Sequence, residues 1–468
     1  MVWPTNPSGW MFQMLAIDTF NADIICLLLF PLVPLAAYGL VRLLRSKFGS
    51  GAAGPIEKPP ENAGGMESVN AADHRLGLLS LIWRALTGPA PWLRVVLIAA
   101  AVFYAVVVYY RPALEDGLNG GHQWDFGTYY QAARLAAEGG DPYLAHERYN
   151  FKHPYTYPPY TVKLFAPFVS MDLHEARQTF FILKLAVLGA LALLWALLLI
   201  RNVEGAFLLL LVAAYGFHKS LLVELESGNV NLFEIALIWG GVGAFARRKP
   251  VLFALCILAA ALCKFWPFLL IGMLLFFEDR RSRIVFIAAC LAFFALNFGS
   301  YLFDPEQFAR FAETSASRFE ELELTGWNPS ALSFFRFYRG ELAAWSGWNL
   351  PPFLDYAGWG LFAFAVFAVY WETIVRRRSI REPMEFALFT LFAYALILPR
   401  FKDFSFVLLL APAVYVLQRK VPDWTARALL LLLVCVNFHE YVAMFAASAL
   451  YLAFAWSQNR PVPGTPAS

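Results

Sequence analysis

The stretch FFILKLAVLGALALLWALLLI, residues 180–200, is almost entirely apolar. A helix needs about 20 such residues to cross a hydrocarbon core of roughly 30 Å. Comparable runs recur along the chain, so we expect membrane spans near 24–41, 93–110, 177–200, 206–223, 229–246, 250–263, 265–278, 284–303, 353–372, 384–399, 404–418, 427–438 and 441–457. The sequence therefore predicts an all-α polytopic membrane protein with about 11–13 transmembrane helices.

The composition supports this class. Of 468 residues, 59% are hydrophobic and 15% are charged, whereas about 25% of the residues of a soluble domain are charged. The formal net charge of +3 is small and gives no case for nucleic acid as a partner. The five cysteines all lie in apolar segments without metal-ligand spacing, so we interpret them as packing residues. We expect neither a metal site nor a cofactor.

Positive charges predict the orientation. Short cytoplasmic loops carry an excess of Lys and Arg. Five dense clusters fall on one side if the N-terminus is outside and the C-terminus inside, at 42–47, 247–249, 278–283, 376–381 and 418–420. RFKD at 400–403 is the exception, and it falls outside with two long loops, 111–177 and 304–352.

The chain divides into four predicted regions. Residues 1–45 are an N-terminal transmembrane anchor, because no small-residue cleavage site follows the apolar run. Residues 46–75 are a flexible cytoplasmic linker rich in Gly, Pro, Asn and Glu. Residues 76–458 form the main membrane domain, and 459–468 are a disordered tail.

The first outer loop contains QWDFGTYYQAARLAAEGGDPY, residues 123–143. Thr128–Glu138 has helix-forming composition and stops at Gly139-Gly140, a good C-cap. Asp125 therefore has two interpretations. It is the N-cap of this short helix, or it is a catalytic carboxylate, and the two are compatible.

Other polar segments also fall at the outer edge. Residues 150–168, NFKHPYTYPPYTVKLFAPF, have two interpretations. They form the wall of a groove for a sugar or lipid tail, or they form a rigid loop at the membrane interface. ELESGNVN at 224–231 puts two carboxylates and two asparagines at the membrane edge, where polar groups are usually functional, although Gly228 also suits a solvated turn. Residues 305–323 have an approximate apolar face of Phe308, Phe311, Phe319 and Leu322, which would lie on the bilayer surface.

Three cations are candidates for an anion site. Lys264 lies at a break between two short apolar runs, beside Trp266 and Pro267, and either reaches water or meets an anion in a cavity. Arg400 and Lys402 flank an aromatic ring and suit phosphate. The alternative for Arg400 and Lys402 is a solvated turn with lipid-headgroup contacts.

Five segments together resemble one known family. DFGTYYQAARLAAEGGDPY (125–143), with YTYPPYTVKLFAPF (155–168), resembles the first outer loop of glycosyltransferase family 87. GNVN (228–231) resembles its Gly-Gln-x-Asn pattern, with Asn229 where Gln is usual. KFWP (264–267) resembles Lys-x-x-Pro, and WNPSAL (327–332) resembles its Asn-Gln-Ser-Leu region, with Pro329 in place of Gln. PRFKDFSFVLLLAP (399–412) falls where the family has a polar cluster before an apolar helix.

The resemblance, over roughly residues 90 to 420, implies a function and a site. It implies a GT-C fold whose catalytic domain is residues 76–458. The implied enzyme moves a hexose, mannose in the family, from a polyprenyl-phosphate donor to a glycolipid or glycan acceptor. By the resemblance the reaction inverts the anomeric centre, with Asp125 as base, at the extracytoplasmic face of the cytoplasmic membrane. On electrostatic grounds, Lys264, Arg400 and Lys402 are the donor-phosphate residues. The expected substrate-binding residues are Tyr129, Tyr130, Tyr157, Glu224, Glu226, Asn229, Asn231, Asn328 and Asp403.

Two other functions stay open from the sequence. A transporter or lipid flippase would share the many spans, the broken helices and the charge at membrane depth, but no internal repeat is evident and the long outer loops favour an enzyme. A polytopic scaffold that binds partners through the linker would leave Lys264 and ELESGNVN unexplained.

Overall fold

The computed structural model describes residues 91–458, apart from 122, 152, 201, 322–327, 377–379, 381 and 438. Within this part every regular element is a helix and no strand occurs. Four helices are long and apolar enough to cross a membrane, and six shorter apolar helices accompany them. The predicted all-α polytopic class is confirmed. The predicted anchor (1–45), linker (46–75), tail (459–468) and span at 24–41 lie outside the described residues.

The helices fall into three groups along the chain. The entry group is α4 (Pro91–Ala105), the π-helix η2 (Val106–Tyr110) and α5 (Arg111–Leu118). A group of short helices follows: α6 (Trp124–Ala137), η3 (Pro142–Leu144), α7 (Ala145–Arg148), η4 (Pro159–Leu164) and η5 (Ala166–Ser170). The main bundle and its second loop comprise α8 (Leu173–Leu199), α9 (Val203–Ser227), α10 (Asn231–Ala246), α11 (Pro250–Cys263), η6 (Trp266–Phe276), α12 (Arg280–Phe303), α13 (Pro305–Glu321), α14 (Ala331–Ser346), α15 (Phe353–Trp371), η8 (Glu372–Arg376), α16 (Pro383–Ile397), η9 (Asp403–Leu409), α17 (Leu410–Arg419), α18 (Trp424–Cys435) and α19 (Val442–Gln458).

The predicted spans match these helices within a few residues. The span predicted at 250–263 coincides with α11, and the predicted break at Lys264 separates α11 from η6. Side-chain caps fix where two of these helices begin. Asp172 caps α8 by accepting from the His174 and Glu175 amides, and Asp279 caps α12 by accepting from the Ser282 amide.

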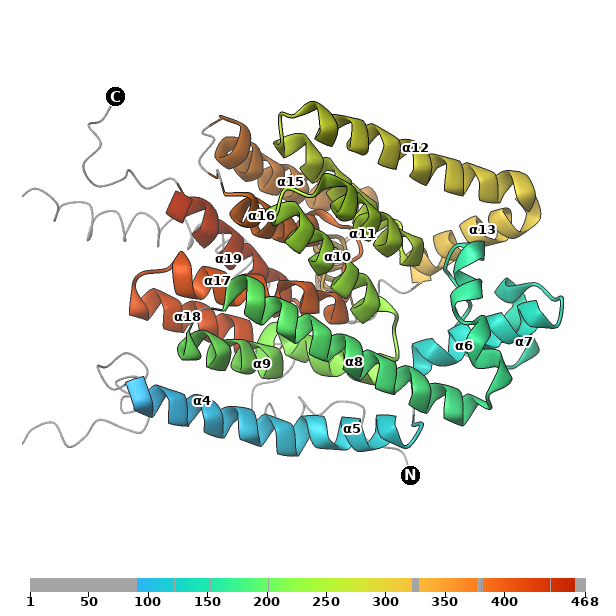
Figure 1. Ribbon diagram of the computed structural model, residues 1–468, viewed down its shortest axis with the longest axis horizontal. Helices are drawn as coiled ribbons and strands as arrows, with labels where there is room; N and C mark the ends of the chain where they lie inside the picture. Colours follow the sequence, from blue (N-terminus) through green and yellow to red (C-terminus); the bar gives the residue numbers. More distant parts are fainter. Residues whose placement is uncertain are drawn as a thin grey trace, which may run out of the picture.

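The bundle has two distinct ends. α6, α7 and α13 gather at one end of the bundle, the end that holds the last residues of α5 and α12 and the first residues of α8 (Figure 1). The α9–α10 turn lies at this end, and Lys264 lies there too because it contacts Asn231. α10 runs away from this end and α11 returns to it, so the cations at 247–249, between the two helices, lie at the opposite helix ends.

Helix α9 is broken within the bundle. Residues 216–219 are non-helical, and Phe217, His218 and Lys219 have φ of 49°, 58° and 56°. Three left-handed non-glycine residues are strained and persist only where packing fixes them. Phe217 is fully buried and stacks on Phe406 of η9 with ring centroids 5.5 Å apart. Protein packing rather than lipid therefore surrounds the break, as membrane interiors require.

Helix α13 does not have the surface position expected for 305–323. Phe311 is buried, with its ring 5.6 Å from that of Phe265 and 6.4 Å from that of Tyr143. Arg310 pairs with Asp141 at 2.9 Å. The expectation that this face lies on the bilayer is wrong at Phe311, because the first outer loop and the Lys264 break supply an apolar surface that the sequence pattern cannot foresee. Leu322 and the side chain of Phe319 lie outside the described part.

Candidate active site

Asp125 lies in the first turn of α6 but does not cap it. The N-cap is Gln123, whose backbone is non-helical (φ −108°, ψ 89°) and whose side chain makes no capping bond. The N-cap interpretation of Asp125 is wrong because the helix begins at Trp124, ahead of the predicted Thr128. The predicted C-cap is confirmed, since Gly139 has φ of +80° and the Gly140 amide donates to the Leu135 carbonyl at 2.9 Å.

The Asp125 carboxylate is held from the α9–α10 turn. Asn229 Nδ2 donates to Asp125 Oδ2 at 2.6 Å and lies 3.4 Å from the Tyr157 hydroxyl. The hydroxyls of Tyr157 and Tyr129 are 2.7 Å apart. Burial raises the pKa of Tyr157, with Lys264 opposing and Asp125 reinforcing the shift. Tyr157 therefore stays protonated as a hydrogen-bonding group within electrostatic reach of both the acid and the cation.

The same turn reaches the cation at the helix break. Asn231 donates its amide N–H to Asn229 Oδ1 at 2.9 Å, and Asn231 Oδ1 accepts from Lys264 Nζ at 3.0 Å. Gly228 makes the turn possible, because its φ is +65° and a Cβ there would stand 2.6 Å from Cβ of Gln123. Asp125 and Lys264, far apart in sequence, are thus joined by one hydrogen-bonded turn.

The positive charge of Lys264 is balanced by a neighbouring carboxylate. The Lys264 ammonium pairs with Glu234 Oε2 at 3.2 Å, and the side chain is 24% exposed. It also lies 5.5 Å from the centre of the Phe404 ring. Lys264 is therefore half-buried against a carboxylate, an amide and an aromatic face, rather than reaching freely into water.

Lys402 approaches the same aromatic ring from the loop between α16 and η9. Its ammonium lies 5.3 Å from the Phe404 ring centre and makes no hydrogen bond or ion pair with the described residues. Burial lowers the pKa of Lys402 to about 8; Asp125 and Asp403 oppose this shift, and Arg400 and Lys264 add to it. The acid and the three predicted cations thus belong to one electrostatic group.

Asn328 and Asp403 support this loop. Asn328 Oδ1 accepts from the Phe401 amide at 2.9 Å, and Ser330 Oγ donates to the Pro399 carbonyl at 2.7 Å. Asp403 is buried, and its carboxylate accepts from the Phe404 amide at 2.8 Å. Both predicted site residues therefore shape the backbone that carries Arg400 and Lys402.

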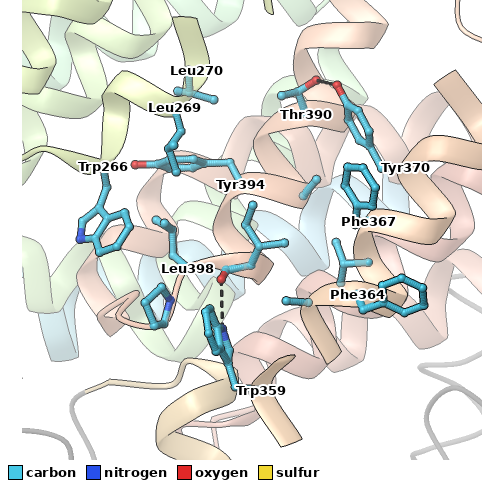
Figure 2. A pocket seen from close by; sticks show the side chains of 15 residues that line it. Trp266, Leu269, Leu270, Trp359, Phe364, Phe367, Tyr370, Thr390, Tyr394 and Leu398 are labelled. Atoms are coloured by element: carbon cyan, nitrogen blue, oxygen red, sulfur yellow. Dashed lines mark hydrogen bonds between the residues drawn. The ribbon is translucent and has the colours of Figure 1, made fainter. Parts of the chain in front are cut away.

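An apolar groove is lined in part by sequence neighbours of these cations. It has a volume of about 560 Å³ and runs between η6, α15 and α16, with Trp266 and Pro399 among its lining residues. Figure 2 shows Trp266 and Leu269 facing Tyr394 and Leu398, with Trp359 and Phe364 farther along. Phe364 and Leu269 are 69% and 54% exposed, so the groove opens on the lipid-facing surface of the bundle.

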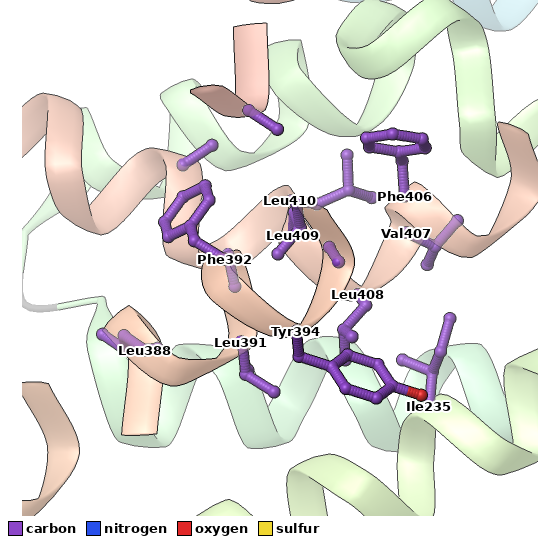
Figure 3. Packing of buried hydrophobic residues seen from close by; sticks show 14 of the residues in the cluster. Ile235, Leu388, Leu391, Phe392, Tyr394, Phe406, Val407, Leu408, Leu409 and Leu410 are labelled. Atoms are coloured by element: carbon purple, nitrogen blue, oxygen red, sulfur yellow. The ribbon is translucent and has the colours of Figure 1, made fainter. Parts of the chain in front are cut away.

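Packing around α16 and η9 holds the cation-bearing loop between them. Figure 3 shows Leu391 of α16 and Tyr394 beside Leu408 of η9, with Ile235 of α10 next to the Tyr394 ring. Ile235, Leu391 and Leu408 are at most 2% exposed. Close packing is the main source of helix association in lipid, because lipid tails are as apolar as leucine. The short 398–402 loop is thus fixed at both ends.

Three predicted site residues lie elsewhere. The Tyr130 hydroxyl donates to the Met171 carbonyl at 2.8 Å and braces the outer loop. Glu226 is exposed on α9, where its charged neighbours are Asp116 and Lys219. Glu224 is fully buried and pairs with Lys184 at 3.0 Å. Glu224 and Glu226 point to different sides because residues two apart on a helix do not share a face. Neither is placed as a substitute base.

Two charged residues near the site were not predicted from the sequence. Lys184 of α8 and Glu234 of α10 pair with Glu224 and Lys264 respectively. Each lies alone within an apolar run, and charge at membrane depth is the signal that would have found both. In the described part, no three His, Cys, Asp or Glu side chains group as a metal site.

Comparison with known proteins identifies the family. Residues 155–399 match glycosyltransferase family 87, and this segment is more than half of the 468-residue chain. The chain belongs to glycosyltransferase family 87. No curated protein and no solved structure matches the chain.

The membership makes this protein a membrane-embedded glycosyltransferase. The matched segment contains Tyr157, Asn229 and Lys264, begins after Asp125 and ends just before Arg400. Hydrogen bonds and shared electrostatics, rather than the match, connect Asp125 and Lys402 to it. The family supports a transferase rather than the transporter that the sequence also allowed.

Proposed function

We propose that this glycosyltransferase transfers a hexose, mannose by the family resemblance, from a polyprenyl-phosphate donor to a glycolipid or glycan acceptor. The observation that carries the proposal is the lipid-facing groove of about 560 Å³. Its lining residues include Trp266 and Pro399, which are two positions from Lys264 and one from Arg400 in the sequence. A prenyl chain suits the groove, and its phosphate then meets the cations near Asp125.

The chemistry is a single displacement within a GT-C arrangement. The Asp125 carboxylate takes the proton of the acceptor hydroxyl while that oxygen bonds to the anomeric carbon. The bond from this carbon to the phosphate oxygen breaks, and the configuration inverts. Asn229 occupies Asp125 Oδ2, which supports Oδ1 as the proton acceptor. Lys402, Arg400 and Lys264 stabilise the charge that develops on the leaving phosphate.

The proposed location is the extracytoplasmic side of the cytoplasmic membrane. The cations at 247–249, 280–283 and 419–420 occupy helix ends opposite the Asn229 turn. Lys and Arg concentrate in short cytoplasmic loops. This distribution supports an active site facing away from the cytoplasm.

The direct test is transfer by the purified protein in proteoliposomes. Radiolabelled polyprenyl-phosphate mannose and other polyprenyl-phosphate hexoses are supplied with membrane lipid extract. We expect a new labelled glycolipid or glycan from at least one donor. Movement of intact donor across the vesicle membrane without any glycosylated product would instead favour a transporter.

Donor use should depend on the charge of Lys402. Its pKa of about 8 means that the ammonium is charged below this pH and neutral above it. Since kcat/KM reports groups of the free enzyme, donor kcat/KM should fall as the pH rises through about 8. In Lys402→Arg the side chain stays charged, so the fall should move to higher pH. Identical alkaline limbs in both proteins would contradict the role of Lys402.

Filling the groove should discriminate between donors by chain length. Ala363 of α15 lines the groove, and Ala363→Phe adds bulk there. We expect kcat/KM for a long-chain donor to fall about ten-fold, the cost of losing roughly 1.4 kcal/mol of binding, with little change for a two-isoprene donor. Ala288→Phe, on the exposed side of α12, is the matched control. Equal losses for both donors would show that the groove does not hold the chain.

A further inference from the structure

A fully buried ion pair lies behind the candidate site. Lys184 of α8 and Glu224 of α9 are each 0% exposed, with Nζ and Oε1 3.0 Å apart. The Lys184 ammonium also donates to the Glu224 backbone carbonyl. α8 is one of the four helices that qualify as membrane spans. Charge inside such a segment is costly, faces the bundle interior and usually marks function.

The same Glu224 oxygen spans the α9–α10 turn. Glu224 Oε1 accepts from the Leu232 amide at 3.1 Å. Val230, the N-cap of α10, makes no side-chain capping bond. The first N–H groups of a helix need partners from outside it, and Glu224 supplies one across the turn. The ion pair therefore ties the end of α9 to the start of α10.

The turn between these helix ends carries contacts to both halves of the site. Asn229 holds Asp125, Asn231 holds Lys264, and the Asn231 amide donates to Asn229 Oδ1. A shift of the turn would move the base and a cation together. Lys184 makes no hydrogen bond or ion pair with either group in the described part, although its charge acts on both through space. Its effect on the position of the turn therefore passes through Glu224.

We propose that Lys184 is a positioning residue for sugar transfer. By holding the Glu224 carboxylate against the Leu232 amide, it fixes the turn that aims Asn229 at Asp125 and Asn231 at Lys264. This inference rests on the proposed function for its catalytic consequence. A pair that only stabilised the bundle, such as Lys420–Glu385 at 2.6 Å, would not set the geometry of the base.

The test compares three variants in proteoliposomes. Lys184→Met should lower kcat about ten-fold or more, because small misplacements of reacting groups are costly, while the acceptor KM changes less than about two-fold. Lys184→Met/Glu224→Gln should recover kcat to within about three-fold of wild type, because the glutamine carbonyl still accepts from Leu232 and no unpaired charge is left buried. Lys420→Met, which breaks a pair at the other end of the bundle, should keep wild-type kcat.

Hydrogen–deuterium exchange over 227–232 gives a readout independent of activity. Exchange should be slow in wild type, fast in Lys184→Met and slow again in the double variant. If wild type transfers no sugar from any donor, the proposed function fails. Hydrogen–deuterium exchange still tests whether the Lys184–Glu224 pair fixes the α9–α10 turn. Wild-type kcat and exchange in Lys184→Met would overturn the inference. So would a double variant as impaired as Lys184→Met, or one that fails to accumulate.

Discussion

Replacing Asp125 with asparagine is expected to lower kcat by about 100-fold or more, the scale of a lost general base. Asparagine keeps the size of the side chain and can still meet Asn229, which lies 2.6 Å from Asp125 Oδ2. It cannot take a proton from the acceptor hydroxyl. Because the proposed phosphate contacts come from other residues, the donor KM should change much less than kcat.

The control for this substitution is Asp172→Asn. Asp172 is an exposed aspartate that caps α8 through the His174 and Glu175 amides, and asparagine is an equally good cap. Activity and thermal stability should both stay close to wild type. Near-wild-type transfer by Asp125→Asn, in protein that melts normally, would show that Asp125 is not the base.

Removing Lys402 is expected to lower donor kcat/KM about ten-fold or more. Each charge-assisted contact to a phosphate is worth roughly 1.5–3 kcal/mol, and 1.4 kcal/mol is ten-fold in binding. Lys402→Met and Arg400→Met should share this effect, while the acceptor KM changes little. The measurement is donor and acceptor kinetics taken separately. Lys249→Met, an exposed lysine at the opposite helix ends, is the matched control.

Lys264 needs a paired design. Lys264→Met alone would leave Glu234 without its ion-pair partner, since the two lie 3.2 Å apart, and an unpaired buried charge is strongly destabilising. Lys264→Met/Glu234→Gln removes that complication. We expect the double variant to lose donor kcat/KM as Lys402→Met does. Wild-type donor kinetics in Lys402→Met, Arg400→Met and this double variant would refute a phosphate site here.

The sequence was sufficient to predict the helices and to place Lys264 and Lys402 at one end of the bundle. The span at 250–263 was placed to the residue because Pro250 and Lys264 bound its apolar run. The break at Lys264 was visible because a charge and a proline interrupt two apolar runs. Lys264 and Lys402 were expected at one end from alternation of spans, and both lie beside the Phe404 ring.

The rest depended on contacts between segments that are distant in sequence. The Lys184–Glu224 pair joins two helices across 40 positions. A lone charge in an apolar run marks Lys184, but no local pattern identifies Glu224 as its partner. Asp125 was expected as a cap because the helix was predicted to begin at Thr128, whereas α6 begins at Trp124, and Phe126 in its first turn packs against Phe180 with ring centroids 4.5 Å apart. The left-handed stretch at Phe217 has no proline before it, so it was not foreseen.

The most direct test of the central claim is an experimental structure of Asp125→Asn with a polyprenyl-phosphate hexose bound. We expect the phosphate between Lys264 and Lys402, the prenyl chain in the groove lined by Trp266 and Leu398, and the anomeric carbon facing residue 125. A phosphate bound at the opposite helix ends, near 247–249, or a sugar out of reach of residue 125, would contradict it.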